Sequence, residues 1–382
     1  MYAVIYIIIL LFGSLTLKIR IKNINKSIIV MLLFSMLAFN MHYRTTLYTD
    51  TIRFFNTLDI VRYTNINISY KQGFEYLFGN LNYSSVPISG LYIYIFTIFN
   101  NNQLLLASTG GIISFLAIYS ILKTNYLHSR TKQTNLDILV FLTFFSIFNF
   151  QSAVQGIRST LAVSILIFAL INLLYFPNKT NKIIQMIIIV STILIHPVNA
   201  IYVFIVIFSL INTNKLLFIG MNFLLICQSY FFDYIIEFLA IFKGNPIIDS
   251  ILFKSNQYSI DNVSEYLPSE MDIYRSIIRL TIFIVIVSYY YQREKCNLNE
   301  KYFQISILFI SLSIGFLNNP LYIGRITNAL IFLGIPYYKF LFLKTNSEEK
   351  KVTDVIKTII FGILIVFLVD NLRAGIRFYN LG

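Results

Sequence analysis

Long apolar runs recur along this chain, and they constrain its fold more than any other feature of the sequence. In a lipid bilayer no water pairs with the backbone, so a spanning segment must be a helix or part of a closed barrel. The runs are continuous rather than alternating, which favours helices of about 20 residues over barrel strands. We therefore predict an all-α, polytopic integral membrane protein with about 12 transmembrane helices in a single domain, residues 1–382. The predicted spans are 1–17, 27–43, 104–122, 136–150, 157–176, 183–196, 198–212, 216–232, 273–292, 302–318, 325–343 and 356–370.

Composition supports this interpretation and excludes several classes of protein. Of the 382 residues, 57% are hydrophobic and only 12% are charged, as expected for a membrane protein. The net charge of +13 is not gathered in a basic stripe or a known binding module, so we predict no nucleic-acid partner. Cys227 and Cys296 have no metal-ligand spacing, and the sequence contains no Walker, dinucleotide-binding or HExxH motif. We expect no metal and no cofactor.

Lysine indicates the orientation of the predicted helices, because cytoplasmic loops carry an excess of positive residues. If the N-terminus lies on the outer side of the membrane, the lysine-rich loops all face the cytoplasm and the C-terminus also lies outside. Two long non-spanning stretches, 44–86 and 233–272, then face outward as outer loops. The first continues to about residue 99 as a re-entrant or interfacial element, since 87–99 is short for a span. The lysine-rich loops are 18–26, 123–132, 179–182, 293–301 and 344–357.

Arginine has the opposite distribution. On the same map nine of the twelve arginines lie outside or at outer helix ends, although topology alone does not separate arginine from lysine. Arginine differs from lysine in its guanidinium group, which is planar and permanently charged. This group binds phosphate oxygens through two parallel hydrogen bonds. The nine are Arg44, Arg53, Arg62, Arg158, Arg275, Arg279, Arg325, Arg373 and Arg377.

Three of these arginines, Arg158, Arg275 and Arg325, lie near the predicted N-terminus of an inward-running helix. Such a helix end already carries partial positive charge and free N–H groups, so a cation there indicates a nearby anion. Arg279 follows Arg275 by four residues on one helical face, where like charges repel unless a counter-ion is present. We predict one shared anionic ligand on the outer face. The alternative is that each arginine reaches lipid headgroups or pairs with an outer carboxylate.

A turn with the sequence ILIHPVNAIY joins the two short predicted helices 183–196 and 198–212. Pro197 breaks the helix, and the exposed carbonyls are tolerated at membrane depth only beside protein or a water-filled cavity. His196 is then either a hydrogen-bonding turn residue or a catalytic base.

Several of these segments resemble one family. Arg44, Asp50 and Phe54 in RTTLYTDTIRF resemble the signature after the second span of the EpsG-like branch of Wzy-type polysaccharide polymerases. QSAVQGIRSTLAVSIL is similar to the arginine-led helix of that family, although Ser159 stands where the family usually has glutamine. ILIHPVNAI resembles its histidine turn, and NPLYIGRITNAL resembles its late outer arginine. The resemblance covers most of the chain by order and spacing.

The resemblance implies a metal-independent glycosyltransferase with a GT-C-like helical bundle in the bacterial inner membrane. Such polymerases join oligosaccharide repeat units carried on undecaprenyl diphosphate. The implied partners are the lipid-linked glycan donor and acceptor, membrane lipids and a chain-length regulator protein. The implied catalytic residues are Arg158, which stabilises the leaving diphosphate, and either Asp50 or His196 as general base. Glu75 and Asp272 are weaker alternatives as base, and the diphosphate contacts are Arg44, Arg158, Arg275, Arg279 and Arg325, with Arg44 pairing Asp50 as the alternative.

Two other functions fit parts of the pattern. A flippase for lipid-linked oligosaccharides predicts charges along a path from both faces, whereas arginine here is concentrated on one. An O-antigen ligase or acyltransferase would also use outer arginines or a histidine. Ligases typically have one dominant outer loop, and this chain divides its outer residues between two. The polymerase is the primary hypothesis, with the flippase and the ligase as alternatives.

Overall fold

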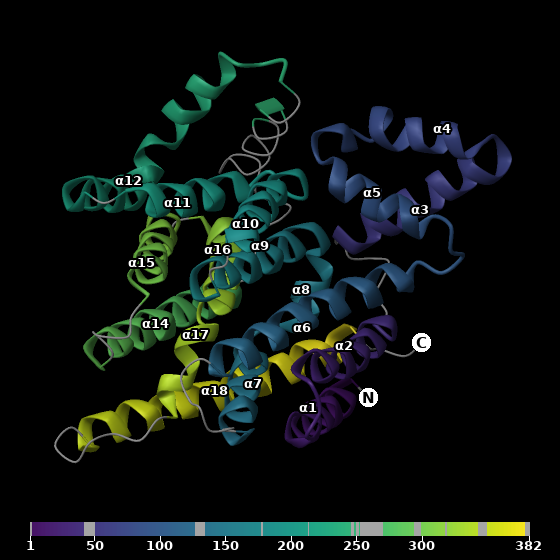
Figure 1. Cartoon of the computed structure of the whole chain (residues 1–382). Helices are drawn as coiled ribbons and strands as arrows, with labels where there is room; N and C mark the ends of the chain where they lie inside the picture. Colours follow the sequence, from purple (N-terminus) through teal and green to yellow (C-terminus); the bar gives the residue numbers. More distant parts are fainter. Residues whose placement is uncertain are drawn as a thin grey trace. The chain divides into compact units, whose positions relative to one another are not determined.

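The computed structural model of the chain describes residues 2–41, 50–126, 134–176, 179–212, 214–245, 248–249, 252, 270–293, 299–317, 319–342 and 350–378. Within these ranges every regular element is a helix, which confirms the all-α prediction (Figure 1). The helices form two compact units built from interleaved stretches of chain. Unit 1 comprises Met1–Phe74, Tyr92–Ser164 and Gly334–Gly382, and unit 2 comprises Glu75–Leu91 and Ile165–Leu333.

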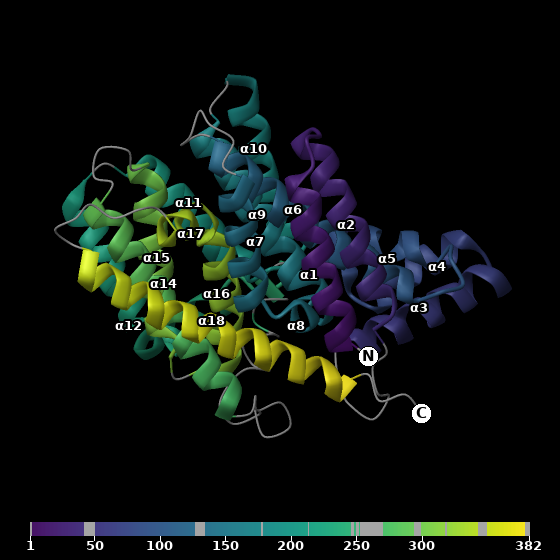
Figure 2. The ribbon, with the colours of Figure 1, turned by 90° about the horizontal axis from the view of Figure 1, so that it is seen from below.

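Unit 1 is held together by close packing of α2 on α6 and by a cluster of aromatic rings. Gly110 of α6 permits the close approach, because a Cβ there would lie 2.8 Å from the Cβ of Ala38 in α2. Small residues at helix interfaces are typical of membrane proteins, where apolar burial does not drive helix association. The rings of Phe34 and Phe145 stack with centroids 4.3 Å apart, and the Tyr6 hydroxyl donates a 2.8 Å hydrogen bond to the Phe145 carbonyl. These helices are α1 (Tyr2–Lys18), α2 (Asn23–Phe39), α6 (Gln103–Tyr126) and α7 (Thr134–Ile147), and Figure 2 shows α1 and α2 side by side.

The predicted outer stretch 44–86 is largely helical where it is described. Its main element is α3 (Asp50–Asn67), and the buried side chains of α3 recur every three or four residues. This spacing defines one buried face of an amphipathic helix. The buried residues are Thr51, Phe54, Leu58, Val61 and Asn65. The elements that follow are α4 (Tyr70–Glu75), η1 (Tyr76–Asn80), η2 (Tyr83–Ser85) and α5 (Pro87–Phe96).

Unit 2 packs around α15, which contacts α11, α12, α14 and α16. Gly315 of α15 permits the approach of α12, because a Cβ at this position would overlap the Leu225 carbonyl. The Gln228 amide of α12 donates a 3.3 Å hydrogen bond to the Leu312 carbonyl, so this buried polar group is paired within the unit. The helices of unit 2 are α10 (Lys179–Ser191), η3 (Thr192–Leu194), α11 (Asn199–Ile211), α12 (Lys215–Ala240), α14 (Glu270–Arg293), α15 (Glu300–Gly315) and α16 (Pro320–Leu333).

Each predicted span contains a helix, and the differences occur at helix ends. The predicted span 325–343 is interrupted, because α16 ends at Leu333 and Pro336 lies in the first turn of α17. Proline lacks the N–H that would continue the hydrogen-bond ladder of α16. The helix predicted over 216–232 is longer than expected and runs to Ala240. The remaining helices are α8 (Phe150–Gln155), α9 (Ile157–Tyr175), α17 (Ile335–Tyr338), η5 (Lys339–Leu341) and α18 (Lys350–Phe378).

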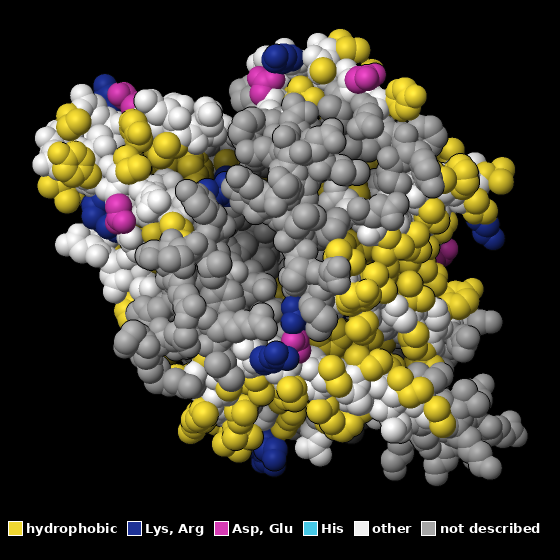
Figure 3. Space-filling model, turned by 180° about the vertical axis from the view of Figure 1, so that it is seen from behind, with side chains coloured by type: hydrophobic (Ala, Val, Ile, Leu, Met, Phe, Trp, Pro, Cys, Tyr) yellow, Lys and Arg dark blue, Asp and Glu magenta, His cyan; other side chains and the backbone are white. Residues whose placement is uncertain are grey.

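Apolar length and apolar surface both indicate a membrane protein. Among the described helices, three are long and apolar enough to cross a membrane, namely Gln103–Thr124, Ile157–Tyr175 and Ile273–Tyr291. Most of the other predicted spans correspond to shorter apolar helices. Many large hydrophobic side chains are exposed, and Figure 3 shows them over much of the described surface of one face, with few charged groups between them. Exposed apolar surface on this scale marks contact with lipid or with other proteins.

Candidate functional site

The residues predicted to act in function divide between the two units. Arg44 lies outside the described residues, Asp50 is described only as the first residue of α3, and Asp272 only as part of α14. Glu75 is exposed at the end of α4. The meeting of Arg158 with Arg325 stays a prediction. Unit 1 contains Asp50 and Arg158, whereas unit 2 contains Glu75, His196, Asp272, Arg275, Arg279 and Arg325.

Arg158 of unit 1 lies at the start of a helix, as predicted. It is the second residue of α9, and Gly156 separates α9 from the short helix α8. Its half-buried guanidinium lies over the ring of Phe54 in α3, with the guanidinium carbon 5.3 Å from the ring centroid. This is a cation–π contact, and it orients the planar fork of the arginine against a fixed surface. Phe54 and Arg158, which come from separate motifs of the sequence, are therefore in contact.

Two glutamines of α8 precede Arg158 in the chain, and sequence reasoning did not assign them a role. Gln151 is 2% exposed, and among the described residues neither its Oε1 nor its Nε2 has a hydrogen-bond partner. The buried Nε2 of Gln155 also lacks a partner within the described part of the chain. Gln151 and Gln155 are one helical turn apart, and Gln155 precedes Arg158 by three residues. We call Phe54, Gln151, Gln155 and Arg158 the unit-1 cluster.

In unit 2 the chain breaks at the predicted histidine turn. α10 and η3 end before His196, and α11 begins at Asn199. The His196 N–H donates a 3.0 Å hydrogen bond to the Thr192 carbonyl, and the His196 carbonyl accepts a 3.0 Å bond from the Asn199 N–H. The backbone of the turn is thus hydrogen-bonded within the turn itself. The His196 side chain is half-buried.

Two buried polar side chains follow His196 at intervals of three residues along α11. Asn199 is 1% exposed and Tyr202 is 2% exposed. Among the described residues, the Asn199 Nδ2 and the Tyr202 hydroxyl have no hydrogen-bond partner. Arg325 of α16 lies close enough to the Tyr202 hydroxyl to interact with it electrostatically. We call His196, Asn199, Tyr202 and Arg325 the unit-2 cluster.

The other predicted arginines of unit 2 lie on α14, which packs against α16. The Ser276 hydroxyl is 3.8 Å from the position that a Cβ on Gly324 would occupy, so the chain neighbours Arg275 and Arg325 flank the same helix contact. Both arginines lie five residues after the start of their helices, because α14 begins at Glu270 and α16 at Pro320. The effect of the helix dipole falls off within the first turn. Arg158 therefore lies at a helix start, whereas Arg275 and Arg325 lie in the second turn of their described helices. Anion binding at these three positions stays a prediction.

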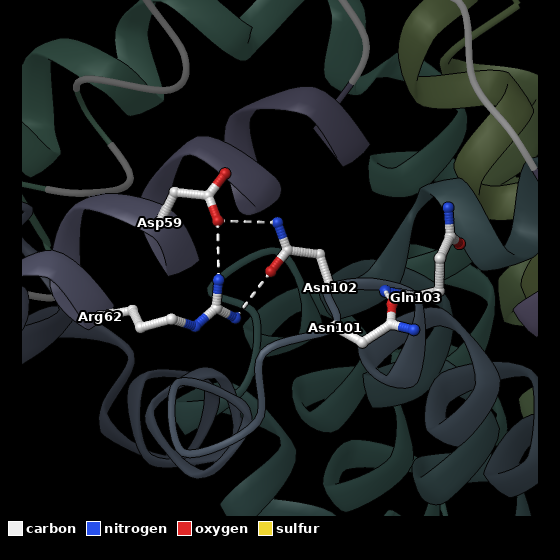
Figure 4. Close-up of polar contacts among 5 residues, drawn as sticks. All are labelled: Asp59, Arg62, Asn101, Asn102 and Gln103. Atoms are coloured by element: carbon white, nitrogen blue, oxygen red, sulfur yellow. Dashed lines mark hydrogen bonds and ion pairs between the residues drawn. The ribbon is translucent and has the colours of Figure 1, made fainter.

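Arg62 is an arginine whose guanidinium is hydrogen-bonded to side chains of the fold itself (Figure 4). Its Nη1 donates to Asp59 Oδ1 at 2.8 Å, and its Nη2 donates to Asn102 Oδ1 at 2.8 Å. Asn102 Nδ2 in turn donates to the same Asp59 oxygen at 3.0 Å. These bonds close a triangle that ties α3 to the residues before α6, so Arg62 follows the carboxylate-pairing alternative. Arg53 and Arg373 are exposed, and Arg377 is described only as part of α18.

Neither metal ligands nor known relatives point to a function. In the described ranges, no three His, Cys, Asp or Glu side chains gather as metal ligands do. Comparison with models of protein families, with curated proteins and with solved structures finds no match to this chain. The function therefore has to follow from the two clusters and from the sequence pattern.

Proposed function

We propose that this chain polymerises undecaprenyl-diphosphate-linked oligosaccharide repeat units into long-chain polysaccharide, by metal-independent glycosyl transfer on the outer face of a bacterial inner membrane. The observation that carries the proposal is the pair of buried donors that follow the His196 turn, because the Asn199 Nδ2 and the Tyr202 hydroxyl have no hydrogen-bond partner among the described residues. A guanidinium, a phenol and an amide all donate hydrogen bonds, and phosphate oxygens accept them. Such a site suits a diphosphate.

The proposed architecture is a GT-C-like bundle of about 12 spans with two outer loops. The lysine-rich loops support this orientation, because they would all face the cytoplasm and leave both termini outside. Three long apolar helices and the shorter apolar ones provide the spanning elements. In this orientation most arginines, unlike the lysines, lie on the side where lipid-linked repeat units are joined.

The arginines would act on the leaving group. When the glycosidic bond between the donor sugar and its diphosphate breaks, negative charge develops on the departing phosphate oxygen. Arg325 would stabilise that charge, with Arg275 on the facing helix α14. The Tyr202 hydroxyl and the Asn199 amide would donate further hydrogen bonds to the phosphate oxygens.

The acceptor supplies the nucleophile. Its sugar hydroxyl attacks the anomeric carbon of the donor, a new carbon–oxygen bond forms, and the lipid diphosphate leaves. The hydroxyl proton passes to a general base. His196 is the base that we favour, because it lies at the start of the turn that also carries Asn199 and Tyr202. A neutral imidazole accepts a proton near physiological pH. Asp50 in unit 1 is the alternative base.

The test is Arg325→Lys in cells that lack the native copy and express the variant at normal level. Lysine keeps the positive charge but not the two-pronged geometry of arginine. We expect long-chain polysaccharide on a gel to fall about 100- to 1,000-fold, as when a transition-state contact is removed. Arg373→Lys, at an exposed position of α18, is the matched control and should leave the chain lengths unchanged.

The same gel separates the alternatives. A failed polymerase still lets single repeat units reach the surface, whereas a failed flippase removes the single repeats as well. A failed ligase leaves long chains attached to their lipid carrier. Normal chain lengths with Arg325→Lys would contradict the role proposed for the unit-2 cluster.

A further inference from the structure

Gln151 is buried in α8, and its amide is unused by the described part of the fold. Its side chain is 2% exposed, and neither of its polar atoms has a hydrogen-bond partner among the described residues. Gln155 repeats the pattern at its buried Nε2 one turn later. An unpartnered buried polar group destabilises the fold, so its presence requires an explanation such as a ligand.

Another buried glutamine shows the ordinary arrangement. Gln228 in α12 is 8% exposed, and its Nε2 donates a 3.3 Å hydrogen bond to the Leu312 carbonyl of α15. That amide joins two helices of its own unit. The amide of Gln151 joins nothing in the described part of the chain, so helix packing does not account for it.

The glutamines lie on a different side of α8 from the face that packs on α6. Phe150 and Val154 pack against Gly110 of α6. Gln151 and Gln155 each follow one of these residues, which places them about 100° around the helix from the packing face. Their spacing of four residues puts both amides on one side of α8. The chain then passes through Gly156 to Arg158, whose guanidinium lies over Phe54.

The chemistry of the amide selects the ligand. A primary amide has two donor hydrogens and an acceptor oxygen, and it carries no charge. A phosphate ester oxygen only accepts hydrogen bonds, so it would leave the Gln151 Oε1 unpaired. A sugar hydroxyl both donates and accepts, so it can pair with both atoms of the amide.

We infer that Gln151 and Gln155 bind a neutral, hydroxyl-bearing sugar ring of the repeat-unit glycan. The inference rests on the proposed function and adds the glycan-recognition site to it. Arg158 then stands at the edge of a neutral sugar site, with the glutamines on its N-terminal side in the chain.

The test uses full-length protein in lipid nanodiscs and two separate probes. One probe is the repeat-unit oligosaccharide, released from its lipid by mild acid and followed by saturation-transfer NMR. The other is inorganic pyrophosphate. For Gln151→Met, which keeps a linear side chain without the amide, we expect at least about tenfold weaker oligosaccharide binding, the loss of two ordinary hydrogen bonds. Pyrophosphate binding should not change.

Thermal unfolding separates recognition from folding. Removing an unpartnered buried amide should leave the melting temperature of Gln151→Met equal to or above that of the wild type. Gln155→Met is the second variant and should behave in the same way. Gln228→Met is the matched control: its melting temperature should fall, because a formed hydrogen bond is lost, and its oligosaccharide binding should stay normal.

The outcomes separate this inference from the function on which it rests. Unchanged oligosaccharide binding in both α8 variants, or a clearly lower melting temperature of Gln151→Met, overturns the glycan site alone. The glycan site alone is also overturned if the wild type binds pyrophosphate but no oligosaccharide, or if Gln151→Met weakens only pyrophosphate binding. A wild-type protein that binds neither probe removes the proposed function as well.

Discussion

The two clusters place an arginine in different surroundings. In unit 1, Arg158 begins a helix beside neutral amides and lies over an aromatic ring. In unit 2, Arg325 lies in the body of α16 near a buried phenol and the histidine turn. Amides that both donate and accept suit a neutral sugar, whereas a group of donors suits an anion. The neighbours of an arginine, more than its charge, therefore indicate the ligand of a site.

The largest expected effect is the loss of polymer synthesis on substitution of Arg158. This loss would distinguish Arg158 from arginines that stabilise the fold. Lysine at position 158 would keep the charge but lose the planar group that lies over Phe54. Under the sequence-based hypothesis Arg158 also stabilises the leaving diphosphate, so we expect Arg158→Lys to lower the rate of polymer synthesis by about 100- to 1,000-fold while the protein still inserts and folds. The measurement is the rate of chain growth in isolated membranes supplied with lipid-linked repeat units.

Arg62→Lys is the control for this change. A lysine there can still pair with Asp59, and it loses mainly the bond to Asn102. The Asp59 side chain is 58% exposed, so the expected loss of stability is below about 1 kcal/mol, with no change in chain growth. If both substitutions abolish synthesis to the same degree, the distinction between paired and ligand-binding arginines is lost.

A smaller effect tests whether the two clusters depend on separate packing. Gly315→Ala would push a Cβ into the Leu225 carbonyl and shift α15, which contacts α11 and α16. We expect a destabilisation of about 1–3 kcal/mol, as for other overpacked sites. Because α11 and α16 carry the unit-2 cluster, pyrophosphate binding should weaken while binding of the repeat-unit oligosaccharide persists. Thermal unfolding and the two binding assays measure these effects.

Gly362→Ala is the matched control, since a Cβ at that position of α18 meets no atom within 4 Å among those described. Alanine is favoured over glycine in a helix by about 0.5–1 kcal/mol, so this variant should be at least as stable as the wild type. If Gly315→Ala weakens the binding of pyrophosphate and of the oligosaccharide equally, the two clusters do not depend on separate packing.

Much of the helical fold could be predicted from the sequence, because long apolar runs have few alternatives in a membrane. The run at 157–176 closely matches α9, which spans Ile157–Tyr175. Helix starts were less predictable, since α16 begins at Pro320, before its apolar run. Proline at the first helical position and Asn319, whose Oδ1 accepts a hydrogen bond from the Tyr322 N–H, were the local signals for that start.

The candidate sites were predictable only in their charged members. Arg158, His196 and Arg325 stand out in an apolar sequence, because an ionisable group at membrane depth requires a reason. Gln151, Asn199 and Tyr202 do not stand out, since such residues are common at membrane boundaries and in loops. Their role depends on burial without a partner, which arises only when distant helices pack around them.

The most direct test of the proposed polymerase asks whether one lipid-linked substrate contacts both Arg158 and Arg325. Full-length protein in nanodiscs would be treated with the arginine reagent phenylglyoxal, with and without the undecaprenyl-diphosphate-linked repeat unit, and modification would be read by mass spectrometry. We predict that the substrate protects both Arg158 and Arg325 from modification, while the exposed Arg373 reacts equally in both samples. Protection of only one of the two arginines, or of neither, would contradict it.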